Sequence, residues 1–308
     1  MMEWTREAAD EVLRLFLART GLENTKTKLI SFRQTAIFYL ADHDASLRVY
    51  GPGEDPVRAE RMVQLARHLA GQDFPAIRPH AAFADQPFDI ANLRASVWHW
   101  IEADDPMPKT DEMLGRLLRQ LHDLPGSNAL RLESFDPVGK IRQRLKRLKS
   151  MQVIPASGLR ALQAALARAL DMGGELRESR LGIGLIHGDA TPGNIVVSGG
   201  KAILIDLDSS ALGAREWDLV PMAVASKRFS QSQERWLRFI DAYGIDEHGL
   251  PGLEAASLVK QLTMTCYLCL SAGMSAAIDN EIRNRLRMWE EWDLDGRWHS
   301  GFSVARPE

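Results

Sequence analysis

The chain has 308 residues, of which 45% are hydrophobic and 26% are charged, and its formal net charge is -3 at pH 7. This composition is typical of a globular protein rather than a disordered one, and the length predicts two domains or lobes of ordinary size. A nucleic-acid-binding protein usually has a basic excess, so we expect no nucleic-acid partner.

The first hundred residues predict one helix and then a series of short strands. The charged, amphipathic segment 5–20 predicts a helix that Thr5 caps and Gly21 ends, and it does not resemble a secretory signal. Runs rich in β-branched and aromatic residues predict strands, at residues 26–31, 35–41, 46–50, 79–83 and 93–101. A further helix lies between the third and fourth runs, with one apolar face formed by Met62, Val63, Ala66 and Leu69.

The rest of the chain is mainly helical in pattern. One apolar stripe is formed by Leu114, Leu117, Leu118 and Leu121, more helix fills 155–178, and helix continues to about residue 292 after a small β element. We therefore predict a β-rich N-terminal lobe, residues 1–102, and a larger α-helical C-terminal lobe, residues 103–308. The lobes join at about residues 98–105, and the cleft between them is the expected ligand site.

Only two cysteines are present, Cys266 and Cys269, which is no disulfide framework and favours a reducing, cytoplasmic location. Their C-x-x-C spacing is typical of redox or metal sites, but the apolar surroundings predict a plain buried helix. The uncharged run 262–278 is slightly too short to span a bilayer and predicts a core helix, so we expect no membrane partner.

The segment "LIHGDATPGNIVV", residues 185–197, brings an acid and an amide together in a loop just before a strand. Two β runs, 195–197 and 202–205, follow around a glycine-containing turn and predict a hairpin. Folding about Gly199 or Gly200 places Ile205 or Asp206 opposite Asn194. Asn194 and Asp206 should therefore lie side by side, with Asp189 on the loop that leads in.

These three side chains predict the minimum set for phosphoryl transfer. Magnesium prefers oxygen ligands and typically takes one or two carboxylates plus substrate phosphates, which Asn194 and Asp206 fit. Asp189 then remains to accept a proton from a hydroxyl group. An isolated H-x-D-x-x-x-x-N pattern occurs by chance, but its combination with the hairpin indicates a kinase-type site. His187 is expected to shape the loop through a hydrogen bond.

The sequence resembles the aminoglycoside phosphotransferase and choline kinase-like family over nearly its whole length. "HGDATPGN" is similar to the catalytic loop of that family, and "LIDLD" to its metal-binding segment. "REWDL" and "LGRLLRQLHDL" resemble two of its helix motifs. The resemblance implies an α+β, two-lobed protein-kinase-like fold. It also implies Asp189 as catalytic base, Asn194 and Asp206 as Mg2+ ligands, and Asp208 as an accessory residue.

The N-terminal lobe departs from the family pattern in two places. Kinases hold phosphates with a lysine on the third strand that pairs with a glutamate on the next helix. Here Arg48 is the candidate cation and Glu60 its candidate partner, although both also fit ordinary surface charges.

The glycine-rich phosphate loop is also missing. Ser31, Gln34 and backbone amides are therefore candidates to cover the phosphates, and Trp100 and Ile101 at the joint are further nucleotide-binding candidates. ATP and GTP both remain open as the co-substrate.

The segment around residues 289–298 allows two interpretations. Glu290, Glu291 and Asp293, with Asp295, lie among three tryptophans, and carboxylates beside aromatic faces suit a cationic ligand. The same pattern fits a solvated terminal helix docked by its tryptophans.

We predict a small-molecule kinase that transfers the γ-phosphoryl group of ATP or GTP to a hydroxyl group. The acceptor is an aminoglycoside-like antibiotic, which would make this a resistance enzyme, or a metabolite such as choline, homoserine or a sugar. A protein kinase is disfavoured because residues 206–215 leave no room for a long activation loop. The alternative is a catalytically silent nucleotide-binding module, and a helical scaffold without a nucleotide site is a third.

Overall fold

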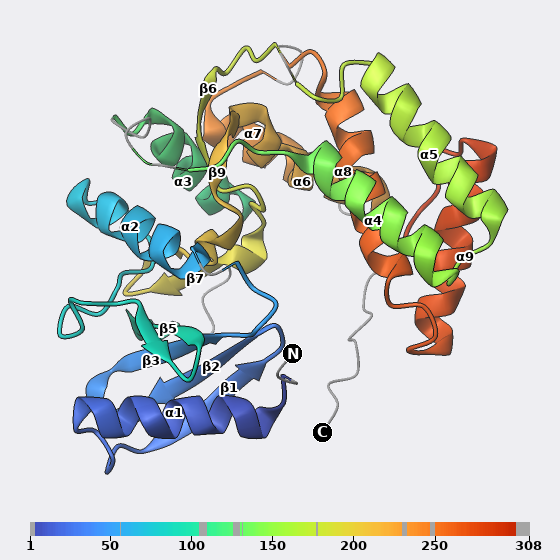
Figure 1. Ribbon diagram of the computed structural model, residues 1–308. Helices are drawn as coiled ribbons and strands as arrows, with labels where there is room; N and C mark the ends of the chain where they lie inside the picture. The colour runs from blue at the N-terminus through green and yellow to red at the C-terminus, as the bar shows by residue number, and fades with distance from the viewer. Residues whose placement is uncertain are drawn as a thin grey trace. The chain divides into compact units, whose positions relative to one another are not determined.

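The computed structural model describes residues 4–55, 57–104, 110–125, 130, 132–176, 178–229, 233–246 and 250–299 (Figure 1). The chain divides into two units. Unit 1 comprises Met1–Lys109, Leu124–Leu132 and Gly193–Ser209, and unit 2 comprises Thr110–Asp123, Glu133–Pro192 and Ser210–Glu308. Unit 1 therefore includes the hairpin that follows Asn194, although the sequence places it far beyond the predicted joint. The predicted lobe limits, and the cleft between them, stay predictions.

Unit 1 is built on an antiparallel five-stranded sheet with the strand order β1-β2-β3-β5-β4. The strands are β1 (Thr27–Phe32), β2 (Thr35–Leu40), β3 (Ala45–Tyr50), β4 (Phe88–Ile90) and β5 (Leu93–His99). Burial alternates along β2, as expected for a strand that covers a core with one face. The predictions at 26–31, 35–41, 46–50 and 93–101 are confirmed to within a few residues, whereas β4 was not predicted.

The predicted strand at 79–83 is wrong. Pro79 makes only an isolated bridge with Trp98, and His80 N–H donates to the Val97 carbonyl at 2.9 Å. Because proline has no backbone N–H, it cannot contribute a donor to a continuing ladder. The segment therefore contacts β5 without forming a strand.

Helix α1 (Arg6–Thr20) lies along the sheet of unit 1, as Figure 1 shows. Thr5 caps it by accepting a hydrogen bond from the Ala8 N–H at 3.2 Å, and Gly21 ends it with a left-handed φ of 70°. Its buried face packs with the sheet in one core, and the helical residues of that core are Ala9, Val12, Leu13, Phe16 and Leu17. Helix α2 (Arg58–Gly71) buries its predicted apolar face. Both helix predictions are confirmed.

The predicted hairpin is confirmed as β7 (Ile195–Ser198) and β8 (Lys201–Leu204), with Ser198 paired to Lys201. Gly199 and Gly200 form its two-residue turn with φ of 57° and 72°, a conformation that favours glycine. The Asp104 carboxylate accepts hydrogen bonds from both glycine N–H groups, at 3.0 and 2.7 Å. These contacts hold the turn in a defined position within unit 1.

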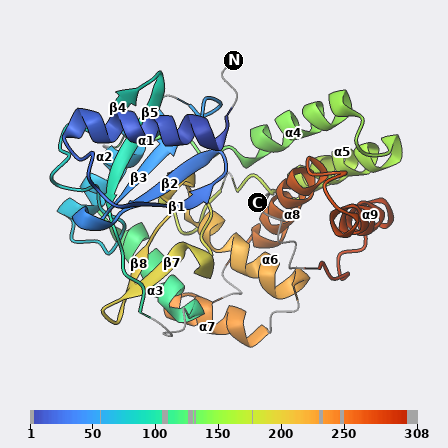
Figure 2. The same cartoon turned by 90° about the horizontal axis from the view of Figure 1, so that it is seen from below.

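Unit 2 is mainly helical and contains the two-stranded sheet of β6 (Ile183–Ile186) and β9 (Ala211–Ala214). Its helices are α3 (Asp111–Asp123), α4 (Pro137–Met151), α5 (Ala156–Asp171), α6 (Val220–Arg228), α7 (Gln233–Tyr243), α8 (Leu253–Cys269) and α9 (Ala276–Glu291). Figures 1 and 2 show α4 beside α8 and α5 beside α9. The apolar stripe predicted in α3 is buried, whereas α4 was not predicted and α5 ends earlier than expected.

Cys266 and Cys269 are free and buried in α8, which confirms the predicted plain helix. Burial raises the pKa of both thiols to about 12. The run 262–278 is not one helix, however, because α8 ends at Cys269 and Ser275 caps α9 by accepting a hydrogen bond from the Ile278 N–H. None of the helices in the described part of the chain has the length and apolar composition needed to cross a membrane.

Candidate active site

The loop that carries Asp189 follows β6 in unit 2. The His187 ring is fully buried, and its Nδ1 accepts a hydrogen bond from the Asp189 N–H at 3.3 Å. This contact agrees with the loop-shaping role expected for His187. The ring sets the backbone at Asp189, so the direction of the carboxylate depends on a buried group.

A second aspartate, Asp218, binds the backbone of this loop. It is fully buried in the short helix Arg215–Asp218, within "REWDL", and accepts hydrogen bonds from the His187 and Gly188 N–H groups, both at 2.7 Å. The ring of His122 contacts the same carboxylate at 3.0 Å and the Tyr243 hydroxyl at 2.7 Å.

Burial opposes the charge of Asp218, but the hydrogen bond and charge of His122 outweigh it and lower the pKa of the carboxyl. The Asp218 carboxylate is thus an ionised anchor for the loop. His122 and Asp218 lie in "LGRLLRQLHDL" and "REWDL", and the sequence alone predicted no role for either residue. Their position inside two recognised motifs was the available signal.

The side chain of Asp189 is paired with Lys260 of α8. Lys260 Nζ lies 2.8 Å from Asp189 Oδ1, and the two side chains are 21% and 48% exposed. The carboxylate is therefore fixed by a cation and still open to solvent. Lys260 was missed because 71 residues separate it from Asp189 in the sequence. The signal was a single lysine in the otherwise uncharged stretch 255–269.

The hairpin brings Asn194 and Asp206 to neighbouring positions in unit 1. The Ile205 N–H donates to the Asn194 carbonyl at 3.0 Å, which confirms the predicted register. Asp206 follows directly with a φ of 58°, a left-handed conformation that is uncommon for a residue other than glycine. Such backbone strain is typically found at functional sites. Metal binding by Asn194 and Asp206 stays a prediction.

Arg48 on β3 pairs with Asp208, two residues after Asp206. Arg48 Nη2 donates to Asp208 Oδ2, and Arg58 Nη2 at the start of α2 lies 3.1 Å from the same oxygen. Glu54 pairs with Arg58 in turn. Burial opposes the charge of Arg48, but the Asp208 carboxylate outweighs it, assisted by Tyr50 and Asp206, and raises the pKa of Arg48. This charge cluster of Arg48, Glu54, Arg58 and Asp208 joins β3, α2 and the segment after the hairpin.

The predicted pairing of Arg48 with Glu60 is wrong. Glu60 lies 3.3 Å from Arg94 of β5, and its side chain is 40% exposed. Arg58 and Glu60 are two residues apart on α2, so they point to opposite sides of the helix, and only Arg58 faces Asp208. Arg58 is the helix residue that our sequence reasoning missed. A nucleotide-binding role for Glu60 stays a prediction.

The turn between β1 and β2 replaces the expected glycine-rich loop. The Arg33 N–H donates to the Thr35 carbonyl at 3.1 Å, and the Gly51 N–H donates to the Gln34 carbonyl at 3.0 Å. Residues 31–35 all have negative φ, so this turn needs no glycine. Ser31 is partly exposed and Gln34 is exposed. Their predicted contact with phosphates is untested.

Trp100 and Ile101, the candidates at the joint, are both partly exposed. The Trp100 N–H donates to the Asp44 carbonyl at 2.8 Å, and its ring lies 4.4 Å from the ring of Tyr39. Trp100 is thereby fixed against the sheet of unit 1. Nucleotide contact by either residue stays a prediction.

The acidic residues near the end of the chain have partners within the chain. Glu290 and Glu291 are exposed on α9, and Glu291 pairs with Arg287 at 2.5 Å. Asp293 accepts hydrogen bonds from the Asp295 and Gly296 N–H groups, which lower the pKa of its carboxyl.

The tryptophans near these acids are also engaged. Arg168 lies 4.0 Å from the ring centre of Trp292, and Arg285 lies 3.9 Å from that of Trp298. Trp289 and Trp298 are buried. The aromatic faces thus hold the chain's own cations, which favours the docked terminal helix over a cationic-ligand pocket. The substrate role of Glu290, Glu291 and Asp293 stays a prediction.

The donor set around Asp206 fits magnesium better than a softer metal. Among the described residues no group of three or more His, Cys, Asp or Glu side chains is arranged to hold a metal ion. Asp208 Oδ1, however, is buried and accepts no hydrogen bond from the described residues. Oxygen donors with an unsatisfied carboxylate oxygen suit Mg2+, which binds through one or two carboxylates and substrate phosphates.

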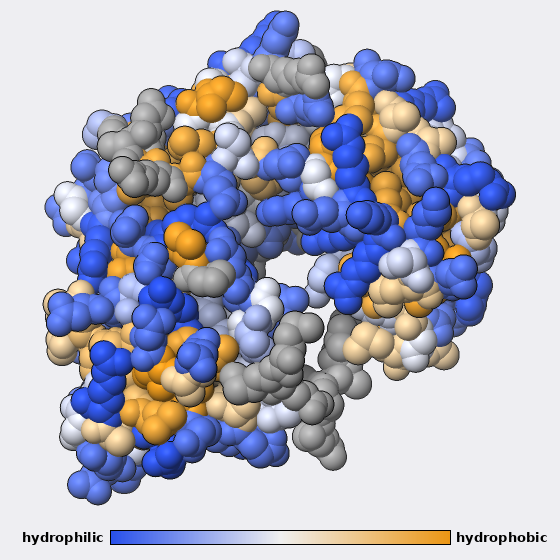
Figure 3. All heavy atoms as spheres, viewed as in Figure 1, coloured by the Kyte–Doolittle hydropathy of each residue, from blue (hydrophilic) through white to orange (hydrophobic). Residues whose placement is uncertain are grey.

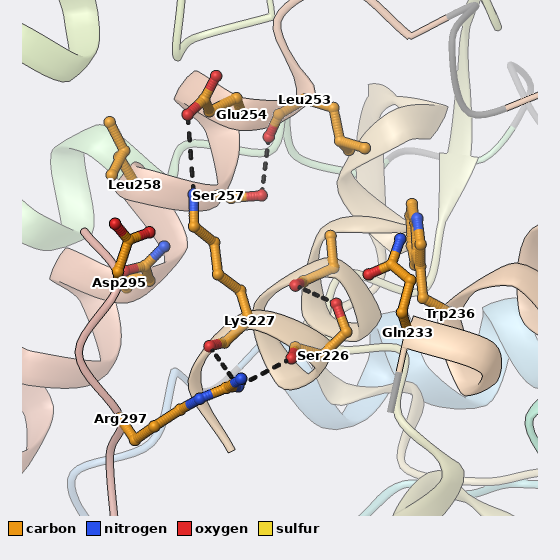
Figure 4. A pocket seen from close by; sticks show the side chains of 12 residues that line it. Ser226, Lys227, Gln233, Trp236, Leu253, Glu254, Ser257, Leu258, Asp295 and Arg297 are labelled. Atoms are coloured by element: carbon orange, nitrogen blue, oxygen red, sulfur yellow. Dashed lines mark hydrogen bonds and ion pairs between the residues drawn. The ribbon is translucent and has the colours of Figure 1, made fainter. Parts of the chain in front are cut away.

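Unit 2 also contains a cavity of about 550 Å³ between α6, α7, α8 and the segment around Arg297 (Figure 4). Lys227 and Glu254 form an ion pair across it at 3.7 Å. Arg297 donates to the carbonyls of Ser226 and Lys227, and Ser257 donates to the Leu253 carbonyl. Its charged groups are thus largely paired with one another or with backbone.

The model of the phosphotransferase enzyme family, APH, matches residues 30–258. No curated protein matches the chain in sequence. Among solved structures, a choline/ethanolamine kinase family protein from Mesorhizobium loti is 16% identical with a TM-score of 0.64, and 92% of each chain is covered.

Amicoumacin kinase hAmiN, solved with AMP-PNP, Ca2+ and Ami, is 10% identical with a TM-score of 0.72, covering 94% of this chain and 97% of that one. Aminoglycoside phosphotransferase APH(3'')-Id from Streptomyces rimosus is 18% identical with a TM-score of 0.59, covering 84% and 98%. These likenesses confirm the predicted protein-kinase-like fold, with a β-rich N-terminal part and a mainly helical C-terminal part.

Proposed function

Since this chain belongs to the phosphotransferase enzyme family, we propose that it transfers the γ-phosphoryl group of ATP or GTP to a hydroxyl group, with Mg2+ as cofactor. The family confirms the resemblance noted in "HGDATPGN" and "LIDLD". The chain is a phosphotransferase with an alcohol acceptor, of the small-molecule kinase type. The nucleotide, the metal and the roles of individual residues are the content of the proposal.

The convergence of Arg48, Arg58, Asp206 and Asp208 in unit 1 is the observation that carries the proposal. Two guanidinium groups and two carboxylates meet where β3, α2 and the hairpin come together. Guanidinium groups bind phosphate oxygens through short charge-assisted hydrogen bonds, and carboxylates bind the metal that accompanies a triphosphate. Arg48 thus takes the place of the usual lysine, with Arg58 as a second cation.

Asn194 and Asp206 would hold Mg2+, with Asp208 as an accessory ligand through Oδ1. When bound, the ion neutralises charge on the nucleotide phosphates. The role of the chain here is to supply oxygen donors at fixed positions, and the hairpin register and the Asp104 contacts support that role.

Asp189 acts on the acceptor. Its half-exposed carboxylate orients the acceptor hydroxyl and takes its proton as the bond from the acceptor oxygen to the γ-phosphorus forms. The bond from that phosphorus to the β,γ-bridging oxygen breaks, and the nucleoside diphosphate leaves with the electron pair. Lys260 holds the Asp189 carboxylate in place.

The family does not specify the acceptor, because its members act on different hydroxyl compounds, as the names of the related structures show. The related structures include kinases whose names specify amicoumacin, aminoglycosides, choline/ethanolamine and aminopropanol. We propose that the acceptor of this chain is likewise a small hydroxyl compound, an antibiotic or a metabolite.

The Asp206→Asn variant tests the nucleotide site. We expect binding of ATP or GTP in the presence of Mg2+ to weaken by at least about 10–100-fold, the loss typical for a disturbed metal site. Titration calorimetry with and without Mg2+ measures this, and Asp10→Asn on the exposed side of α1 is the control. Unchanged Mg2+-dependent binding in Asp206→Asn would show that Asp206 is not a ligand.

Turnover separates this function from the catalytically silent alternative. We expect mass spectrometry of a hydroxyl-compound panel incubated with ATP or GTP and Mg2+ to detect phosphate gain by at least one compound. Phosphate gain must disappear with Asp189→Asn, so that a contaminating kinase is excluded. Tight nucleotide binding without turnover on any acceptor would favour the silent module.

A further inference from the structure

Helix α4 carries a concentration of positively charged residues. It contains six basic residues and no Asp or Glu, in a chain whose net charge is negative. The basic residues are Lys140, Arg142, Arg144, Lys146, Arg147 and Lys149. Figure 3 shows hydrophilic side chains gathered over this helix. Such a concentration of one sign on one helix attracts anions.

Arg144 is the most informative of these residues, because it is partly buried and pairs with no acid in the part of the chain that the structure describes. Its Nη1 donates to the Thr263 carbonyl of α8 at 3.0 Å, and its guanidinium carbon lies 5.5 Å from the ring centre of Tyr267. No carboxylate of the described residues forms an ion pair with it. Burial lowers the pKa of Arg144, with Cys266 and Tyr267 opposing. A desolvated cation without a counter-charge is costly.

Arg144 reaches the same side of α8 as Lys260, the partner of Asp189. Lys260 and Tyr267 are seven residues apart, which is about two helical turns, so their side chains lie on one face. The Tyr267 side chain is 62% exposed. One face of α8 thus carries Lys260, which contacts Asp189, and about two turns further on the exposed ring of Tyr267. Arg144 of the neighbouring helix α4 lies over that ring. On α4, Lys140 and Arg147 flank Arg144 on its side of the helix.

We propose that this α4–α8 face binds the phosphate acceptor, and that the acceptor is an alcohol bearing an anionic group such as a carboxylate. The hydroxyl lies at Asp189, the body of the molecule packs on Tyr267, and the anion pairs with Arg144. The inference rests on the proposed function, because it takes Asp189 as the group that receives the hydroxyl proton.

The charge of this face disfavours cationic acceptors. An aminoglycoside carries several ammonium groups and choline carries one. Each would approach Lys260, which is paired with Asp189, and Arg144, which has no carboxylate partner among the described residues. Like charges at this range repel, and the repulsion rejects the wrong ligand. The acidic residues near the end of α9 do not offset it, because Asp293 and Glu291 already have partners.

Three matched alcohols test the proposal: 4-(hydroxymethyl)benzoate, its primary amide and 4-(hydroxymethyl)benzylammonium. We expect phosphate gain with ATP or GTP and Mg2+ to give a kcat/KM for the benzoate about 10–100-fold above the amide, the effect of a hydrogen bond to a charged group, with the ammonium compound poorest. Arg144→Gln should remove the preference for benzoate over amide. Arg142→Gln changes the same charge on the side of α4 away from Arg144 and should keep it.

If none of the compounds is phosphorylated, their binding tests the proposal. Titration calorimetry in the presence of the nucleoside diphosphate and Mg2+ measures this binding. Benzoate binding that weakens in Arg144→Gln and not in Arg142→Gln supports the proposal. Equal binding of the three compounds, or preference for the ammonium compound, overturns it. If the wild-type protein bound no nucleotide in the presence of Mg2+, the proposed function itself would fail. The two failures are therefore distinguishable.

Discussion

The basic residues in the charge cluster of unit 1 and on the α4–α8 face of unit 2 differ in their partners. In unit 1, Arg48 and Arg58 both contact Asp208, and Glu54 adds a second carboxylate. In unit 2, Lys260 pairs with the half-exposed Asp189, and the partners of Arg144 among the described residues are a backbone carbonyl and an aromatic ring. Among the described residues, Arg48, Arg58 and Lys260 thus have carboxylate partners, whereas Arg144 has none.

The two proposals assign these sets of cations to two kinds of anion recognition. The acids of unit 1 hold its guanidinium groups in place, so the proposed phosphate site is preorganised, and Asp208 competes there with an incoming phosphate. Arg144 is held by a backbone carbonyl and an aromatic ring, so the proposed anion would meet no competing carboxylate there from the described residues. Substitutions in unit 1 and in unit 2 should therefore change nucleotide binding and acceptor binding separately.

The largest effect is expected from Asp189→Asn in unit 2. The change keeps size and hydrogen bonding but removes the base, so kcat should fall about 10²–10⁴-fold, the usual contribution of general-base assistance. Nucleotide affinity and melting temperature should stay nearly unchanged, because the side chain is half exposed. Steady-state kinetics and calorimetry measure the two quantities. A weakened nucleotide affinity would contradict the separation of the two sites' roles.

Asp218→Ala should destabilise the fold instead. The substitution leaves the His187 and Gly188 N–H groups and His122 without their acceptor in a fully buried place, and loss of one partner of a buried pair costs about 3–5 kcal/mol. Denaturant unfolding measures the loss, with Asp10→Asn as an exposed control.

The pH dependence of stability sharpens the same point. The folded-state pKa of Asp218 lies below its ordinary value of 3.8, so its contribution is present above that pH and is lost as the pH falls through the folded value. Stability of the wild type should therefore decline below about pH 4, and Asp218→Ala should decline less. Parallel curves would show that the carboxylate is not the anchor.

Arg48→Met tests the neutralised cations of unit 1. We expect the KM for the nucleotide to rise roughly 10–100-fold, the effect of one hydrogen bond to a charged group, with kcat changed less. Arg14→Met, at an exposed ion pair on α1, is the matched control. If Arg48→Met left the KM unchanged, Arg48 would serve only to hold Asp208.

The smallest effect is expected at Cys266 and Cys269, beneath the α8 face. Because their thiols have a pKa of about 12, very little thiolate is present at pH 8, and iodoacetamide should leave the folded protein unlabelled and fully active. Both thiols should react in denaturant. Mass spectrometry measures the labelling, and modification of the native protein would reveal opening of the core that contains both cysteines.

The sequence predicted the local features of the site well. The hairpin and the place of Asn194 and Asp206 followed from a glycine turn and strand periodicity, and the α1 cap followed from Thr5 and Gly21. These are contacts between residues near each other in the chain, where the backbone geometry permits few arrangements. The strand at 79–83 failed because a β-rich composition does not reveal whether a ladder partner is available.

Partners from distant parts of the chain were the residues that the sequence did not identify. Nothing near Arg48 indicates that its partner is Asp208 rather than Glu60, since helix phase and strand order decide which acid faces it. Lys260 and Arg144 likewise gain their meaning only where α4, α8 and the loop at Asp189 pack together. The sequence by itself determined the residue types and local turns of a phosphotransferase. The tertiary structure alone decided which charges are paired and which remain for a ligand, because ion pairing depends on distances of a few ångströms that only packing sets.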